Sequence, residues 1–278
     1  MKKRVFKELM NAYEEGQYQE IVKWEKQSPN IAAQAINVAL KPVSWVVGAV
    51  IPQKAIEGAL TASNWLAESM TDKKDLLRDG GVQIIENLQH KDLELSDKMA
   101  NSVHNWADVI VTAEGGGAGF FGLPGMVIDI PALITLSLRT IHKIGLCYGF
   151  ECKTNADKQF IYGIMSAAGS NSVKEKSVAV ATLQMMSVTI AKTTWKRISE
   201  RALENKFGVD AAIMAIRTLA KQLGINITKR KAAQAVPFIG AGVAAAMNLA
   251  FMNDVAWAAR RSFQQRWLIV NGKVDIQE

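Results

Sequence analysis

The sequence predicts an all-α protein that folds as a single compact multi-helix domain. Apolar residues recur at helical spacing along nearly the whole chain. No run of β-branched residues alternates with polar residues between hairpin turns, as an exposed sheet requires. No linker rich in Pro, Ser or charged residues divides the 278 residues, of which 49% are hydrophobic, so the chain can bury one large core.

The amino-terminal region is expected to hold one long helix and a short buried hairpin. The helix runs from about residue 5 to residue 26 and ends before Pro29, because proline can open a helix but cannot continue one. Two uncharged stretches at 45–51 and 59–66, separated by Pro52, then predict a pair of buried helices.

Two helices, a glycine-rich segment and a strongly periodic helix follow. The helices are expected at 72–87 and 92–112, each opened by an aspartate that favours the positive end of the helix dipole. Segment 114–125 contains six glycines but lacks the Gly-x4-Gly-Lys-Ser/Thr pattern of a phosphate-binding loop, so it is interpreted as allowing close helix packing or a sharp turn. Asp129 opens the periodic helix, and Gly149 is placed to be its left-handed cap.

The pattern in the second half of the sequence predicts three more helices. Ser172 and Glu175 form a capping-box signature for a helix that reaches about residue 207, and another helix is expected at 209–223. A Gly/Pro-rich apolar segment at 236–242 precedes the last helix, which carries Asp254, Arg260, Arg261 and Trp267. Because segment 114–125 is also followed by an acidic residue and an arginine-bearing helix, the two regions indicate a loose internal duplication.

Charge is distributed unevenly between the two halves. Residues 1–138 hold 13 Lys/Arg and 17 Asp/Glu, a net charge of −4, whereas residues 139–278 hold 20 and 9, a net charge of +11. An anionic partner or ordinary solvated helix faces both explain this excess. The candidate anionic-surface contacts are Lys229, Arg230 and Lys231. The uncharged run 232–253 is the best candidate for bilayer insertion, but it is rich in Ala and Gly and gains little from hydrocarbon.

Catalytic and metal-binding patterns are poorly supported. Asp97, Asn101, His104 and Asp108 would lie on one helix face and place an imidazole between two carboxylates, a donor set that suits a divalent metal. No Glu-x-x-His pair accompanies them, so the face is interpreted as solvated, and no metal or cofactor is predicted. The chain has no Gly-x-Ser-x-Gly elbow, and Cys147 lies in an apolar helix where a thiol acts as a small hydrophobe.

The order of several motifs resembles the EcsC protein family over about residues 20–265. These motifs are Trp24-Glu25, Pro42, Ile51-Pro52, Glu114-Gly-x2-Ala-Gly-x2-Gly, Asp129-Ile-Pro131, Leu133, Arg139, Tyr148-Gly149, Val236-Pro-x2-Gly-Ala-x3-Ala, Asn248 and Asp254. One departure is Phe150-Glu151, where the family tends to have an aromatic residue followed by Asp. The resemblance divides the single domain 1–278 into an amino-terminal helix extension at 1–19, a family core at 20–265 and a tail at 266–278.

The resemblance implies helical bacterial proteins, cytoplasmic or membrane-associated, without an established reaction. The family's motif positions in this chain are a polar cluster of Glu114, Asp129, Arg139 and Asp254, together with Gly115, Gly119, Gly122, Pro131, Tyr148, Gly149, Pro237 and Gly240. The charged members, with Arg260, are interpreted as a structural ion-pair network, because a lone buried charge is too costly.

The leading hypothesis is a non-catalytic accessory or regulatory protein on the cytoplasmic face of the inner membrane. The resemblance implies a link to an ABC transporter or to membrane homeostasis. The expected partner is an anionic membrane surface or a membrane protein, and nucleic acid is not expected because no helix-turn-helix or zinc module is recognisable. The alternative is a protein that binds a lipid or small ligand, or a hydrolase, with the polar cluster at the base of an apolar pocket.

Overall fold

The computed structural model describes residues 2–28, 57–58, 60–61, 73–118, 122–199, 218, 221–222 and 241–277. This part of the chain contains seven α-helices that pack together, and the prediction of an all-α fold is confirmed. The helices are α1 (Ala12–Lys26), α4 (Lys74–Gly80), α5 (Leu93–Ala118), α6 (Gly122–Cys147), α7 (Asn155–Ala168), α8 (Val173–Ser199) and α10 (Ala241–Val270). Short 3-10 helices lie at η1 (Lys7–Leu9) and η3 (Ile85–His90), and strands at β1 (Lys2–Val5) and β2 (Val274–Gln277).

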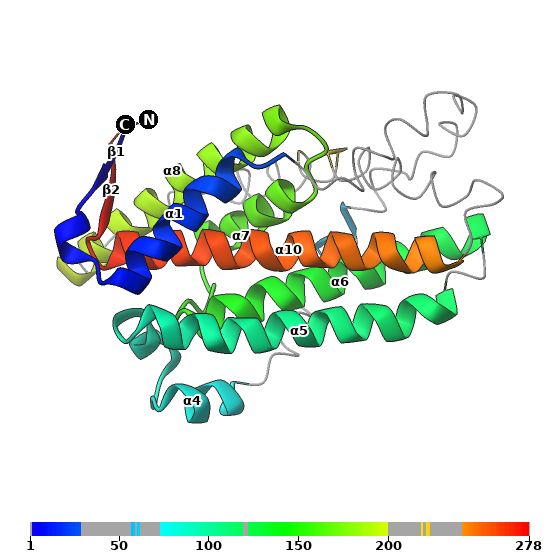
Figure 1. Cartoon of the computed structure of the whole chain (residues 1–278), viewed down its shortest axis with the longest axis horizontal. Coiled ribbons are helices and arrows are strands. Elements are labelled where there is room, and N and C mark those ends of the chain that lie inside the picture. The colour runs from blue at the N-terminus through cyan, green and yellow to red at the C-terminus, as the bar shows by residue number, and fades with distance from the viewer. Residues whose placement is uncertain are drawn as a thin grey trace.

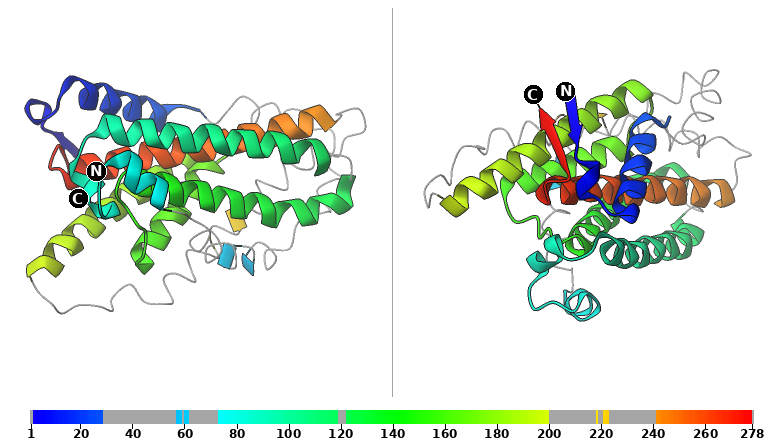
Figure 2. Two further views of the ribbon diagram at one scale, coloured as in Figure 1. Left: turned by 90° about the horizontal axis from the view of Figure 1, so that it is seen from below. Right: turned by 60° about the vertical axis from the view of Figure 1, so that its left-hand side comes forward.

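Helix α10 lies at the centre of the arrangement. It contacts α1, α5, α6, α7 and α8. Figure 1 shows α5 and α6 running along one side of it, with α1, α7 and α8 on the other side. Figure 2 shows from below that α5 and α6 lie next to each other. A side chain on α10 can therefore face either of two layers of helices, one formed by α5 and α6 and the other by α1, α7 and α8.

An aromatic cluster fills the core at the carboxyl-terminal half of α10. The Phe263 ring is fully buried, and its centroid lies 6.4 Å from that of Tyr148, 5.8 Å from that of Phe150 and 5.4 Å from that of Phe160. A Cβ on Gly145 would lie only 2.8 Å from the Phe263 ring. Such offset and edge-to-face pairs add to the free energy gained from burial.

A buried ion pair joins α10 to α7. Arg266 Nη2 donates to Asp157 Oδ1 over 2.8 Å, and the guanidinium lies 4.3 Å from the Phe150 ring centroid. Burial acts to raise the pKa of Asp157, but the Arg266 charge and the hydrogen bonds from Thr154 outweigh it and hold the pKa below its usual value. The pair therefore stays ionised in the core, where a lone charge is costly.

The turn after α6 forms as the sequence predicts. Gly149 has a φ of +86°, its N–H donates to the Leu146 carbonyl over 3.0 Å, and the Phe150 N–H donates to the Gly145 carbonyl over 2.9 Å. This is the Schellman pattern that closes a helix with a left-handed residue. The predicted cap at Gly149 is confirmed.

The predicted helix start at residue 5 is wrong. Asn11 is the N-cap of α1: its side chain accepts from the Glu14 N–H over 2.8 Å, and the Glu14 carboxylate accepts from the Asn11 N–H over 2.9 Å. Ahead of this capping box, β1 pairs antiparallel with β2, with Lys2 opposite Gln277. The two ends of the chain therefore meet, as the right-hand view of Figure 2 shows.

Other helix boundaries in the structure also differ from the predicted ones. The single helix expected at 72–87 is wrong, because α4 ends at Gly80 and the chain turns before η3. Helix α6 starts at Gly122 rather than Asp129, so the glycine-rich segment is mostly helical within the described residues. Ser172 Oγ accepts from the Glu175 N–H over 3.2 Å at the start of α8, as predicted.

Several predictions fall outside the described residues. They concern the hairpin at 45–51 and 59–66 except for Leu60 and Thr61, the helix end near 207, most of the helix at 209–223, and the segment 232–240. The internal duplication stays a prediction.

The first prediction concerns Gly149. A Cβ there would lie 2.5 Å from the Gln89 backbone nitrogen and 3.1 Å from the Ile85 carbonyl oxygen. We expect Gly149→Ala to lower the free energy of unfolding by more than about 2 kcal/mol, because the left-handed backbone alone costs roughly 1–2 kcal/mol.

The matched control is Gly16→Ala within α1, where no atom lies within 4 Å of the new Cβ. It should stabilise by about 0.5–1 kcal/mol. Denaturant unfolding giving both variants the same sign would contradict this account.

The second prediction concerns His142, which is buried in α6. Burial and the nearby Lys158 charge lower its pKa to about 4, against the opposing effect of Asp157. Since an unfolded histidine titrates near 6.5, the stability from a neutral His142 is complete above about pH 6.5 and is lost as pH falls towards 4. We expect His142→Gln to remove roughly 3 kcal/mol of the pH dependence between pH 6.5 and 4. Identical slopes for wild type and variant in chemical denaturation would refute this.

Candidate functional site

An extensive polar cluster centres on Asp97, which is only 3% exposed on α5. Its carboxylate accepts hydrogen bonds from Tyr13 Oη over 2.7 Å, from Tyr148 Oη, and from Gln264 Nε2 over 2.7 and 2.9 Å. Burial, together with the Asp97 charge and hydrogen bond, raises the pKa of both tyrosines above the usual value. Both phenols therefore remain protonated donors near neutral pH.

A second layer of polar groups closes this cluster. Arg261 Nη1 donates to Gln17 Oε1 over 2.8 Å and to Gln264 Oε1 over 2.9 Å. Arg260 Nη1 donates to Asn101 Oδ1 over 3.0 Å. Together with the hydrogen bonds to Asp97, these bonds join α1, α5, α10 and Tyr148 after the end of α6. The Asp97 carboxylate and the Gln264 amide have their hydrogen-bond partners within the cluster, whereas the buried Arg260 Nε has none among the described residues, and the arrangement supports a structural role for Asp97.

The prediction of a solvated face is wrong for Asp97 and His104, which are buried, whereas Asn101 on the same face is exposed. His104 is 5% exposed, its Nε2 lies 3.0 Å from Asn253 Oδ1, and its ring contacts Trp257 edge-on at 5.5 Å. Helix α10 covers this face of α5. Within the described ranges, no group of three or more His, Cys, Asp or Glu side chains is placed to hold a metal ion. The side chain of Asp108 is outside the described residues.

Cys147 is also buried, as predicted. Burial raises the pKa of its thiol to about 12. A thiol with this pKa is almost entirely protonated near neutral pH, so Cys147 has little nucleophilic character.

The family-motif residues separate into three groups. Tyr148 bonds to Asp97, and Gly149 forms the helix cap. Glu114, Gly115, Gly122, Asp129 and Pro131 lie on α5 or α6, but the side chains of this group are not described. Gly119, Pro237 and Gly240 lie outside the described residues altogether, as do the candidate anionic-surface contacts Lys229, Arg230 and Lys231.

Of the predicted polar cluster, only Arg139 and Asp254 have described side chains. The Arg139 guanidinium stacks over the Trp106 ring, 4.9 Å from its centroid. Asp254 lines a pocket to which Arg139 does not contribute. The ion-pair network of the motif residues stays a prediction.

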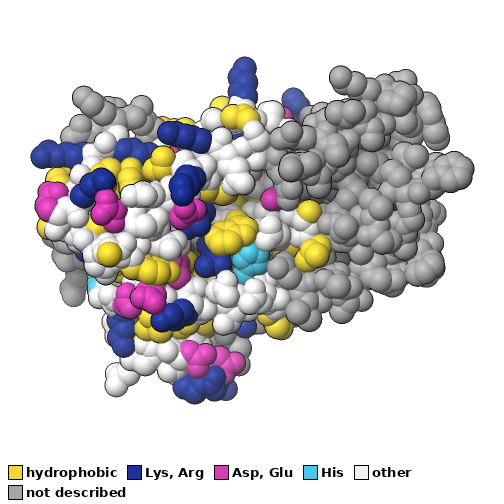
Figure 3. All heavy atoms as spheres, viewed as in Figure 1, with side chains coloured by type: hydrophobic (Ala, Val, Ile, Leu, Met, Phe, Trp, Pro, Cys, Tyr) yellow, Lys and Arg dark blue, Asp and Glu magenta, His cyan; other side chains and the backbone are white. Residues whose placement is uncertain are grey.

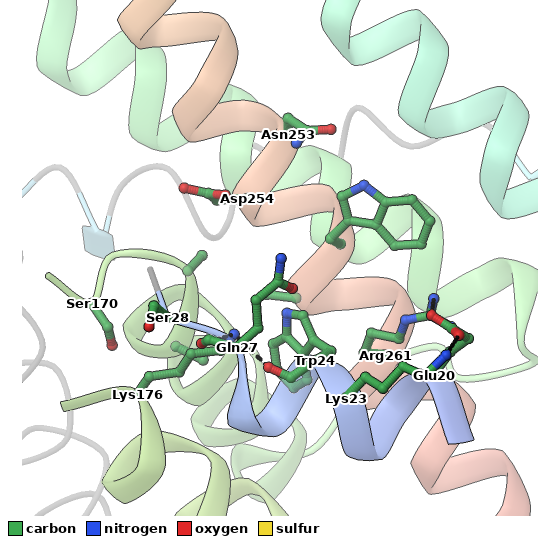
Figure 4. A pocket seen from close by; sticks show the side chains of 14 residues that line it. Glu20, Lys23, Trp24, Gln27, Ser28, Ser170, Lys176, Asn253, Asp254 and Arg261 are labelled. Atoms are coloured by element: carbon green, nitrogen blue, oxygen red, sulfur yellow. Dashed lines mark hydrogen bonds and ion pairs between the residues drawn. The ribbon is translucent and has the colours of Figure 1, made fainter. Parts of the chain in front are cut away.

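This pocket lies between α1, the end of α7, the start of α8 and α10, and has a volume of about 610 Å³. Figure 4 shows Trp24 near its middle, with Lys176 and Ser170 towards one end and Arg261 and Glu20 towards the other. The described lining consists of Glu20, Lys23, Trp24, Gln27, Ser28, Ala167, Ala168, Ser170, Lys176, Asn253, Asp254, Trp257, Ala258 and Arg261. A cavity of this size is within the range of small-molecule sites.

Lys176 fastens the end of α1 to α8 beside the pocket. Its ammonium donates to the Trp24 carbonyl over 2.6 Å and the Gln27 carbonyl over 3.1 Å, and lies 4.6 Å from the Trp24 ring centroid. A cation at these last carbonyls complements the negative end of the helix dipole. Burial lowers the pKa of Lys176 to about 8, against the opposing charges of Asp254 and Glu25.

The other end of the pocket holds a partly exposed charge group. Lys23 Nζ lies 2.6 Å from Glu20 Oε1, and Arg261 Nη2 lies 3.8 Å from Glu20 Oε2. Arg260 and Arg261 lie 4.5 and 4.9 Å from the centroid of Trp257. These cation–π contacts fix the indole against the pocket wall.

A second candidate surface surrounds Trp106, which is 38% exposed on α5. Lys143 Nζ lies 5.5 Å from the ring centroid, on the same helix as Arg139. We call Trp106, Arg139 and Lys143 the Trp106 surface. On the face shown in Figure 3, cationic, anionic and hydrophobic side chains are interspersed over the described elements. The Trp106 surface combines an exposed indole with two cations, as Trp257 does with Arg260 and Arg261 beside the pocket.

Sequence reasoning missed most of the pocket. Trp24 was recognised only as a motif residue, and Lys176 and Trp257 carried no signal, because their roles depend on helix ends far away in sequence. The spacing of Asp97 and His104 was visible, but it could not reveal that α10 covers them.

The third prediction tests the Asp97 cluster. We expect Asp97→Ala to lower the free energy of unfolding by about 3–5 kcal/mol, because Tyr13, Tyr148 and Gln264 lose the acceptor of their hydrogen bonds and Arg261 loses a nearby opposite charge. Glu94→Ala on the exposed side of the same helix is the control and should change stability by less than about 0.5 kcal/mol. Both would be measured by denaturant unfolding. A difference below about 1 kcal/mol between the two variants would rule out the structural role.

No described helix is both long enough and apolar enough to cross a bilayer. No solved structure matches the chain. An uncharacterised protein of Bacillus subtilis (strain 168), YdbA, is 22% identical over 185 residues, which are 66% of this chain and 62% of that protein. The chain thus spans less than two thirds of this relative's length. The profile of the EcsC protein family matches residues 15–268, and the chain belongs to this family.

Proposed function

We propose that this protein is a non-catalytic accessory or regulatory protein that attaches to the anionic cytoplasmic face of the inner membrane. The observation that carries the proposal is the Trp106 surface. An indole that is partly exposed beside cations suits the membrane–water interface, where the ring lies at headgroup level and the cations meet lipid phosphates. Each Lys or Arg near an anionic surface contributes about 1 kcal/mol.

The local geometry supports this role for the two cations. Within the described residues, neither Arg139 nor Lys143 forms an ion pair, and both are placed against the Trp106 ring instead. Their charge is therefore held beside an exposed apolar group without a described carboxylate to neutralise it. The +11 charge of residues 139–278 acts in the same direction, and Lys229–Lys231 are further candidate contacts.

The non-catalytic part of the proposal is supported by the buried ionisable groups. The Asp97 carboxylate is occupied by hydrogen bonds from three side chains, and Asp157 is paired with Arg266. These two carboxylates therefore differ from catalytic groups, which are usually left open to a cleft where a substrate can reach them.

The fourth prediction tests membrane attachment. Purified protein should sediment with vesicles containing phosphatidylglycerol and not with pure phosphatidylcholine vesicles. Binding should fall as salt rises from 0.1 to 1 M, because the Debye length shortens from about 10 Å to about 3 Å. Arg139→Gln with Lys143→Gln should weaken binding by roughly 30-fold, which corresponds to about 1 kcal/mol per cation. Trp106→Ala should also weaken it.

The matched control is Lys98→Gln, an exposed lysine on α5 that pairs with Glu94 over 3.0 Å. It should bind anionic vesicles like the wild type. Equal binding to both kinds of vesicle, or an equal loss in Lys98→Gln, would defeat the Trp106 surface as the contact. No binding to any vesicle would reject the membrane proposal and favour a membrane protein as the partner.

A further inference from the structure

We propose that the pocket between α1, α7, α8 and α10 binds an amphipathic anion, a molecule with an apolar body and one carboxylate or phosphate-type head. This inference is independent of the membrane proposal, because Trp106, Arg139 and Lys143 do not line the pocket.

The apolar part of the pocket is formed by large and small residues in combination. The Trp24 and Trp257 indoles supply broad apolar walls, and Ala167, Ala168 and Ala258 leave room between the helices. All three alanines are less than 9% exposed, so the space exists because these positions carry methyl groups rather than larger side chains. A hollow with aromatic walls and a few polar groups is typical of sites for small molecules with an apolar body.

The charges of the lining favour an anion. The described lining carries the cations Lys23, Lys176 and Arg261 against the carboxylates Glu20 and Asp254, a net charge of +1. Arg261 Nη2 reaches only a long ion pair of 3.8 Å with Glu20, and the Lys23 side chain is 71% exposed. Lys23 can therefore turn towards an anionic head at the end of the pocket that Figure 4 shows beside Glu20, while Arg261, whose Nη1 is held by Gln17 and Gln264, supplies a fixed positive charge there.

Lys176 strengthens the positive potential inside the cavity. It is 6% exposed, and its two carbonyl contacts account for two of its three N–H groups. Its lowered pKa reflects the cost of holding this charge in a buried site, and Asp254 and Glu25 offset only part of that cost. An anion in the pocket reduces the cost further, so its binding is favoured by a charge that the fold already holds in place.

The test is direct titration of the full chain with ligands of matched chain length. Isothermal titration calorimetry would compare decanoate, decyl phosphate and decyltrimethylammonium, each below its micelle concentration. We expect the two anions to bind at least tenfold more tightly than the cation. The order of the two anions identifies the head that the site prefers, a carboxylate or a phosphate.

Two variants locate the binding. Ala168→Leu fills the pocket and should weaken decanoate binding by about tenfold or more. Lys23→Gln, at an exposed position that does not threaten folding, should weaken it by up to about fivefold, the effect of losing one exposed ion pair. The matched control is Ala179→Leu, which projects into a separate hollow of about 590 Å³ between α7 and α8 and should leave affinity unchanged. Far-ultraviolet circular dichroism confirms that each variant is folded.

Three results would overturn the proposal. They are the absence of decanoate binding to the wild type, equal affinity for the cationic and anionic ligands, and an equal loss of affinity in Ala168→Leu and Ala179→Leu. None of these outcomes bears on vesicle binding through the Trp106 surface, so the two proposals can fail separately.

Discussion

The arrangement of the helices depends on the hydrogen bonds to the buried Asp97 carboxylate. A carboxylate with 3% exposure is tolerated only if donors replace the water that it has lost. Those donors come from three other parts of the chain: Tyr13 on α1, Tyr148 after α6 and Gln264 on α10. Since each bond has a narrow range of distance and angle, the cluster fixes how α1, α5, α6 and α10 meet, whereas apolar packing alone tolerates several arrangements.

The positions of both the pocket and the Trp106 surface depend on the helix arrangement that the hydrogen bonds to Asp97 fix. The Asp97 cluster places α1 against α10, and these helices supply Trp24, Trp257 and Arg261 to the pocket. The Arg266–Asp157 pair holds α7 against α10, and Lys176 holds α8 against the end of α1, which completes the remaining walls. On the opposite layer, α5 and α6 lie alongside α10 and bring Trp106 next to two cations.

The sequence allowed prediction of those features that local rules determine. The helical class follows from periodicity, and Gly149 could be assigned because a left-handed cap is set within a few residues. The ribbon of β1 and β2 could not be predicted, because its strands are four residues long and lie at opposite ends of the chain. The Asn11 capping box was overlooked in favour of a helix that began at residue 5. The burial of His104 and the role of Lys176 depend on contacts between residues about 150 positions apart, which no periodicity in one segment can reveal.

The most direct test of the central claim is a double-mutant cycle between Asp97 and Tyr148. Unfolding free energies of the wild type, Asp97→Ala, Tyr148→Phe and the double variant would be measured by denaturant titration. If the Asp97 carboxylate and the Tyr148 hydroxyl depend on each other in the core, the coupling energy should be at least about 1.5 kcal/mol, as for a charged buried hydrogen bond. Additive effects, with a coupling below about 0.5 kcal/mol, would contradict the account, because the two groups would then contribute independently to the packing of the helices.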